Sequence, residues 1–213
     1  MTQQPFAITI GRSLGSGGRY IGKRLAELFG AAYFDKEILS LAARESGLSE
    51  AVFESKDEHK GFLRATLDGM HHAWSLGEFG AKGLTEETLF RVQSDAIRSA
   101  AEHDSCVFIG RCADYVLREH PRLVSVFVAA DQADRVRLIM QRHACDEREA
   151  HKLIEQGDRA RANFYNFYSD KKWGDAATYD LCINSSRLGL DRSTTLIAQF
   201  VAERLGLQFA AKP

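Results

Sequence analysis

The chain has 213 residues, of which 28 are Lys or Arg and 29 are Asp or Glu, so its formal net charge is −1. A chain that is 45% hydrophobic and 27% charged has the composition of a globular domain, which excludes global disorder. The charge balance argues against a protein that overall positive charge holds on a nucleic acid polymer.

Secretory and membrane-spanning segments are not predicted. Residues 1–6 have neither the basic nor the apolar region of a secretory signal. The longest apolar run, 126–130, is far shorter than the roughly 18 residues that a membrane span requires. No pair of the 4 cysteines has C-x-x-C spacing, so neither a zinc site nor a redox motif is predicted. We therefore expect a cytoplasmic protein, with Cys106 and Cys182 buried as reduced thiols inside apolar runs.

The predicted elements alternate between strands and helices. A strand is predicted at 6–10, a helix over 21–29 that ends at Gly30, and a short strand at 32–34. A glycine-rich insertion at 49–84 and a helix over 85–102 follow. Three more strands, predicted to be buried on both faces, span 106–109, 123–129 and 181–183. Helices are predicted over 113–118, 132–143, 147–168 and 193–205. This alternation predicts an α/β fold, a parallel sheet covered by helices, in one domain over 1–213.

Polar clusters follow three of the predicted strands directly. They lie at 11–19, 35–36 and 110–111. In parallel sheets, ligands bind at the carboxyl ends of the strands. The sequence therefore predicts a site where these three clusters meet.

The cluster at 11–19 is a glycine-rich loop between a strand and a helix. Glycines let successive N–H groups point into one concavity, and the helix start adds partial positive charge. The loop therefore predicts an anion nest for nucleotide phosphates at Gly15, Ser16, Gly17 and Gly18. The alternative is a flexible turn without a ligand.

This loop departs from the usual phosphate-binding pattern, G-x-x-x-x-G-K-S/T. When the two are aligned, Arg12 stands at the first glycine, Gly18 at the lysine, and Arg19 at the Ser or Thr that ligates Mg²⁺. The phosphate charge must then be met by Arg12 or Arg19, whose planar fork differs from lysine in geometry. No protein ligand for a metal ion is evident in the pattern.

Six short motifs occur in an order that is more specific than any one of them. They are ITIGRSLGSGGRYIG at 8–22, YFDKEIL at 33–39, VFIGR at 107–111, VFVAADQADRVR at 126–137, DRAR at 158–161 and YDLCIN at 179–184. On these motifs the chain resembles the cytidylate kinase-like family, relatives of bacterial cytidylate kinase among the P-loop nucleoside monophosphate kinases. The resemblance covers about 6–206. It implies a P-loop kinase core with a five-stranded parallel sheet of order 2-3-1-4-5, a helical acceptor-covering insertion at 49–84 and a helical lid over 142–172.

The resemblance also implies roles for individual residues. Arg111 would grip the phosphate of the acceptor, and Asp35 would orient or deprotonate that acceptor, although Asp35 could also cap a helix. In the lid, Arg161 would face phosphate and Asp158 the acceptor sugar. Because Asp158 and Arg161 are three residues apart, the alternative is an ordinary intrahelical ion pair.

Two further arginines, Arg135 and Arg137, match a basic motif at the base of the lid and would contribute to donor binding. Two departures from cytidylate kinases leave the base of the acceptor open: Lys36 and Leu41 replace a hydroxyl residue and an arginine, and Cys112 replaces an acid, with Asp114 two residues further on. A third departure, the absence of the lysine from the loop, leaves the kinase activity itself open.

The predicted function is transfer of a phosphoryl group from ATP, with Mg²⁺, to a small acceptor such as a nucleoside monophosphate. Arg19, Arg161 and Arg135 would compensate for the missing lysine. The alternative, motivated by the loss of the lysine and the hydroxyl from the loop, is a nucleotide-binding regulatory or sensor protein with little turnover. Nucleotides are the expected partners in both cases, and a homodimer is left open.

Overall fold

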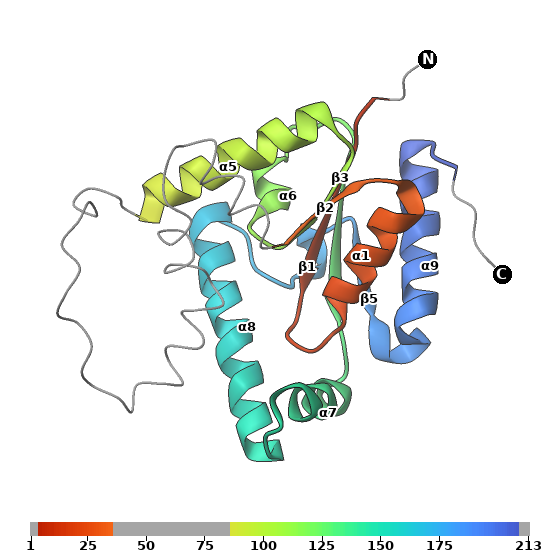
Figure 1. Cartoon of the computed structure of the whole chain (residues 1–213). Helices are drawn as coiled ribbons and strands as arrows, with labels where there is room; N and C mark the ends of the chain where they lie inside the picture. Colours follow the sequence, from red (N-terminus) through yellow and green to blue (C-terminus); the bar gives the residue numbers. More distant parts are fainter. Residues whose placement is uncertain (1–3, 36–85, 209–213) are drawn as a thin grey trace.

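Five parallel strands form one sheet in the computed structural model, which describes residues 4–35 and 86–208 (Figure 1). The strands are β1 (Ala7–Arg12), β2 (Ala32–Phe34), β3 (Cys106–Ile109), β4 (Leu123–Ala129) and β5 (Leu181–Asn184). Their order is β2-β3-β1-β4-β5, which confirms the predicted order. The predicted insertion at 49–84 lies outside the described residues, as do Lys36 and Leu41.

The centre of the sheet is β1, which pairs with β3 on one side and with β4 on the other. Ile8 stands opposite both Val107 and Val124, and all three side chains are fully buried. A strand with two neighbours and helices on both faces has no solvated side, so its sequence is a continuous apolar run. This explains why β1, β3 and β4 could be predicted from local sequence.

Helices cover both faces of this sheet, as Figure 1 shows. On one face, α1 (Gly18–Phe29) and α9 (Ser185–Leu205) pack their apolar residues against the strands. On the other face, α5 (Glu86–His103) and α6 (Ala113–Val116) do the same.

A helical pair follows β4 and corresponds to the predicted lid and its base. The pair consists of α7 (Gln132–His143) and α8 (Glu147–Ser169), which share an apolar cluster that includes Ile139 and Ile154. The carboxylate of Asp146 accepts a hydrogen bond from the Glu149 N–H at 2.8 Å and so caps α8 at its predicted start. A short 3-10 helix, η1 (Ala176–Thr178), leads into β5.

Three expectations about local structure were wrong. The helix α6 ends at Val116, two residues before the predicted end, and α9 begins at Ser185 rather than at 193. The extra turn of α9 lies before Gly189, whose φ of 74° interrupts the helix, and the side chain of Asn184 caps it. Cys182 is exposed although Cys106 is buried, because β5 is an edge strand with only one neighbour.

No helix in the described part of the chain is both long enough and apolar enough to cross a membrane.

Candidate active site

The glycine-rich loop connects β1 to α1 and has the backbone conformation of an anion nest. Gly15 and Gly17 have φ angles of 83° and 80°, in the left-handed region that glycine adopts without steric cost. Gly17 precedes the first turn of α1, where helix N–H groups lack partners within the helix. Hydrogen bonds fix the turn, because the Ser16 hydroxyl donates to the Ser13 carbonyl at 2.9 Å and the Ser185 hydroxyl donates to the Ser16 carbonyl at 2.8 Å.

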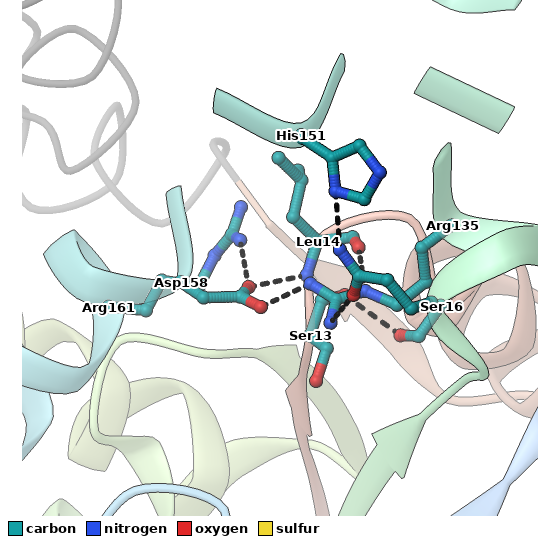
Figure 2. A network of polar contacts seen from close by, with 8 residues as sticks. Ser13, Leu14, Ser16, Arg135, His151, Asp158 and Arg161 are labelled. Atoms are coloured by element: carbon teal, nitrogen blue, oxygen red, sulfur yellow. Dashed lines mark hydrogen bonds and ion pairs between the residues drawn. The ribbon is translucent and has the colours of Figure 1, made fainter. Parts of the chain in front are cut away.

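A polar network ties α7 and α8 to this loop, and Figure 2 shows it from close by. The Leu14 N–H donates to Asp158 Oδ1 of α8 at 2.7 Å, and Arg135 Nε of α7 donates to the Leu14 carbonyl at 2.7 Å. Arg135 also forms an ion pair with Asp158, and Arg161 Nη1 lies 3.5 Å from Asp158 Oδ1. The intrahelical pair that the spacing allowed is therefore present, but Asp158 also contacts the loop and a second arginine.

A pocket lies beside the loop at the carboxyl ends of β1 and β3. It brings together three arginines that the sequence analysis singled out, namely Arg12, Arg111 and Arg161. Each of them has only 5–6% of its surface exposed. Four aromatic side chains from α8 and the segment before β5 also line it: Phe164, Tyr165, Trp173 and Tyr179. Buried arginines that converge on one pocket are typical of a site for an anionic ligand.

Arg111 enters this pocket because the chain turns sharply after β3. Gly110, Arg111 and Cys112 have successive φ angles of 70°, 64° and 53°. The left-handed conformation costs energy at the two positions that are not glycine, and such strain gathers at functional sites. The turn directs a charged residue from the end of a buried strand into the pocket.

Two other arginines that were predicted to bind phosphate do not line this pocket. Arg19 forms an ion pair with Asp35 at the end of β2, with Nε 2.6 Å from Oδ2, and its side chain is 41% exposed. Arg137 pairs with Asp134 at 2.9 Å and is also exposed. Both pairs lie near the loop, but neither arginine lines the pocket of the three buried arginines.

A second hollow lies on the α9 side of the loop. It is lined by Gly15 to Gly17 of the loop, by Arg137 of α7 and by Ser185 and Leu190 of α9. A Cβ on Gly17 would overlap the side chain of Leu190, so the loop and α9 approach each other closely here.

Asp114 is a residue of the pocket that the sequence analysis noted but did not select. The Tyr165 hydroxyl donates to Asp114 Oδ2 at 2.6 Å, which joins α6 to α8 inside the pocket. Burial raises the pKa of the Asp114 carboxyl, and burial together with the nearby Asp114 raises the pKa of Tyr165. The signal in the sequence was the displaced acid two residues after Cys112.

A glycine-rich loop between β1 and α1, on a parallel sheet of this order, defines a P-loop kinase fold. Within that class, the sequence profile of the cytidylate kinase-like family matches residues 7–187, and the chain belongs to this family. No match was found among curated protein sequences.

Three solved structures show the same fold. An uncharacterized protein from Eubacterium ventriosum ATCC 27560 is 26% identical with a TM-score of 0.68, over 92% of this chain and 98% of that one. A shikimate kinase from Bacteroides thetaiotaomicron is 13% identical with a TM-score of 0.52, over 92% and 98% of the two chains. A shikimate kinase from Acinetobacter baumannii, in complex with shikimate, is 16% identical with a TM-score of 0.50, over 94% of each chain. The family and the fold together support phosphoryl transfer as the general chemistry.

Proposed function

We propose that the chain transfers the γ-phosphoryl group of ATP to a small acceptor, and that this acceptor is a nucleoside monophosphate. The observation that carries the proposal is the pocket in which Arg12, Arg111 and Arg161 converge beside the glycine-rich loop. Phosphoryl transfer needs little covalent chemistry from the protein, because positioning and charge neutralisation supply most of the catalysis. A nest for donor phosphates next to a cationic acceptor pocket provides both.

The donor nucleotide fits the loop and the hollow beside it. The left-handed Gly15 and Gly17 let backbone N–H groups face a phosphate, and the N-terminus of α1 adds partial positive charge. The hollow between Arg137 and Leu190 offers an apolar and a cationic wall for the base. ATP supplies the phosphoryl group and leaves as ADP.

The residues of the loop do not supply the usual protein ligand for Mg²⁺. Arg19 stands at the position of the ligating hydroxyl and is engaged with Asp35. Among residues 4–35 and 86–208, no three His, Cys, Asp or Glu side chains are grouped to hold a metal ion. Magnesium would then be held mainly by the phosphates of the substrate and by water, as it commonly is.

The acceptor pocket is lined by polar side chains of two chemically different kinds. Arg111 and Arg161 suit a phosphate, which arginine can bind with two parallel hydrogen bonds. Asp114 is a buried carboxyl that already accepts a hydrogen bond from Tyr165, so a ligand group facing it has to donate. The aromatic side chains that also line the pocket suit a flat base. These features suit a nucleoside monophosphate with an amino group on its base, for which the pocket, whose volume is about 20 Å³ in this structure, has to widen.

The lid would act through Arg161, because negative charge on the transferring group is spread over oxygens that an arginine can contact. We therefore expect Arg161→Ala to lower kcat more than it raises KM for ATP, with a loss of up to about 10³-fold. Arg159→Ala is the matched control, since Arg159 lies on the same helix in an exposed ion pair with Glu155.

The test is an assay of ADP formation from ATP over a panel of nucleoside monophosphates. We expect one or a few monophosphates to be converted to diphosphates, and Arg161→Ala but not Arg159→Ala to abolish this turnover. Tight ATP binding without transfer to any acceptor would overturn the proposal. It would favour the nucleotide-binding regulatory protein that the loss of the lysine suggested.

A further inference from the structure

The glycine-rich loop differs from the usual pattern at two positions that are six residues apart in sequence. Position 12 carries arginine where the pattern has glycine, and position 18 carries glycine where it has lysine. When only the sequence is compared with the pattern, these are two unrelated substitutions. In the structure they are neighbours, because the loop brings the end of β1 against the start of α1.

The side chain of Arg12 crosses the α-carbon of Gly18. A Cβ built on Gly18 would lie 2.6 Å from Arg12 Cβ and 3.1 Å from Arg12 Cγ. The first of these distances is shorter than contacts between real Cβ atoms, and close-packed interiors do not relieve such overlaps without shifting the backbone. Positions 12 and 18 therefore cannot both carry a side chain in this conformation.

The guanidinium of Arg12 lies at the end of β3, in the lining of the acceptor pocket. A Cβ on Gly110 would overlap Arg12 Nη1, so the guanidinium lies directly over the backbone at the end of β3. Arg12 is 95% buried and lines the pocket together with Arg111 and Arg161. This charge lies in the pocket proposed for the acceptor and belongs to the last residue of β1, directly before the glycine-rich loop.

Arg19 and Arg135, the other arginines near the loop that could replace the lysine, make different contacts. Arg19 is 41% exposed and paired with Asp35 at the end of β2. Arg135 is bound to the Leu14 carbonyl and to Asp158. Arg12, in contrast, lines the pocket and lies against the α-carbon of Gly18.

We propose that the side chains at positions 12 and 18 have been exchanged, so that Arg12 supplies from the end of β1 the phosphate-binding charge that a lysine at position 18 supplies in the usual pattern. The inference rests on the proposed function, since it assigns the charge to a nucleotide phosphate. It adds that the loop is a rearranged phosphate-binding loop and not a degenerate one.

The experiment is a mutant cycle that restores the usual pattern in the full-length protein. Three variants are compared with the parent: Arg12→Gly, Gly18→Lys, and the double variant Arg12→Gly/Gly18→Lys. ATP affinity is measured by calorimetry and stability by thermal unfolding without nucleotide. We expect Arg12→Gly to weaken ATP binding about 10- to 100-fold, as for the loss of a charge-assisted contact. Gly18→Lys alone should lower Tm, because the new side chain collides with Arg12.

In the double variant the collision is gone and a cation is present again. We therefore expect it to regain both the Tm lost in Gly18→Lys and most of the ATP affinity lost in Arg12→Gly. The matched control is Arg12→Ala/Gly18→Lys, which should stay unstable because the clash involves the Cβ of position 12 itself. Arg19→Ala serves as the control for loss of a nearby arginine.

Two results would overturn the inference: ATP affinity in Arg12→Gly equal to that of the parent, or a Gly18→Lys variant as stable as the parent. Failure of the proposed function has a different signature, in which the parent binds ATP but phosphorylates no acceptor. In that case the affinity and stability measurements still decide whether Arg12 replaces the lysine.

Discussion

Replacing Asp158 with alanine should lower the stability of the protein and, at the same time, strengthen its binding of ATP. The carboxylate accepts a hydrogen bond from the Leu14 N–H and pairs with Arg135, whose side chain is 11% exposed against 19% for Asp158. A hydrogen bond to a charged group contributes about 1.5–3 kcal/mol. An exposed ion pair contributes about 0–1 kcal/mol, whereas breaking a buried one costs about 3–5 kcal/mol.

The Asp158–Arg135 pair is neither exposed nor fully buried, so its contribution lies between those of the two kinds of ion pair. We therefore expect the free energy of unfolding to fall by about 3 kcal/mol in total. In a chain of this length about 1 kcal/mol shifts Tm by about 2–4 °C, which predicts a decrease of about 6–12 °C. Arg135 and Arg161 would then face the loop without their carboxylate. ATP should therefore raise the Tm of Asp158→Ala by more than it raises the Tm of the parent.

Differential scanning calorimetry with and without ATP measures both effects. Glu155→Ala is the control, because Glu155 pairs with Arg159 on the same helix but both side chains are exposed, and such pairs contribute about 0.5 kcal/mol or less. A Tm decrease in Asp158→Ala no larger than in Glu155→Ala would refute the reasoning, as would an ATP-induced shift equal to that of the parent.

Three further substitutions test separate parts of the site. Gly17→Val should abolish ATP binding, because Gly17 has a φ of 80° and a Cβ there would overlap Leu190; calorimetry showing unchanged affinity would place the nucleotide elsewhere. Arg19→Ala should change ATP affinity by less than about threefold, since an exposed, carboxylate-bound guanidinium contributes little, and a tenfold loss would contradict this. Asp114→Asn should become more stable relative to the parent as pH rises from about 4 to 7. Burial raises the pKa of the Asp114 carboxyl above its unfolded value of about 3.9, so its contribution to stability is complete below that value and is lost as pH rises through the folded pKa. Asparagine does not titrate but still accepts from Tyr165, and urea denaturation giving the same difference at both pH values would contradict this account.

Local signals explain the parts of the fold that could be predicted. The buried runs of β1, β3 and β4 are continuous because both of their faces are covered. Gly30 ends α1 in the left-handed conformation, and Asp146 caps α8 through its own carboxylate. These features depend on residues close in sequence, and the sheet order followed from the resemblance to the family.

Contacts between distant residues explain what could not be predicted. The first turn of α9 lacks apolar periodicity, but Ser185 is anchored to the carbonyl of Ser16, 169 residues away in sequence. Asp114 reaches the pocket only because Gly110, Arg111 and Cys112 are all left-handed. A pattern of residue types does not encode such a turn.

Local sequence predicted which polar clusters come together, but not the contacts that their side chains make. The polar cluster after β3 does meet the loop after β1, at the carboxyl ends of two neighbouring strands. The partners of the individual arginines were not visible, since Arg19 could reach Asp35 or the phosphates with equal ease from its position in the sequence. The structure distinguishes Arg12 from Arg19 as a replacement for the lysine. Arg12 is buried against Gly18 in the pocket, whereas Arg19 is exposed and paired with Asp35.

The most direct test of phosphoryl transfer is ³¹P NMR of the parent protein with ATP, Mg²⁺ and an equimolar mixture of nucleoside monophosphates. The account predicts that the γ-phosphate signal of ATP decays while signals of ADP and of one added nucleoside diphosphate grow at equal rates. Decay of the γ-signal into inorganic phosphate alone, or no decay while ATP is bound, would contradict it.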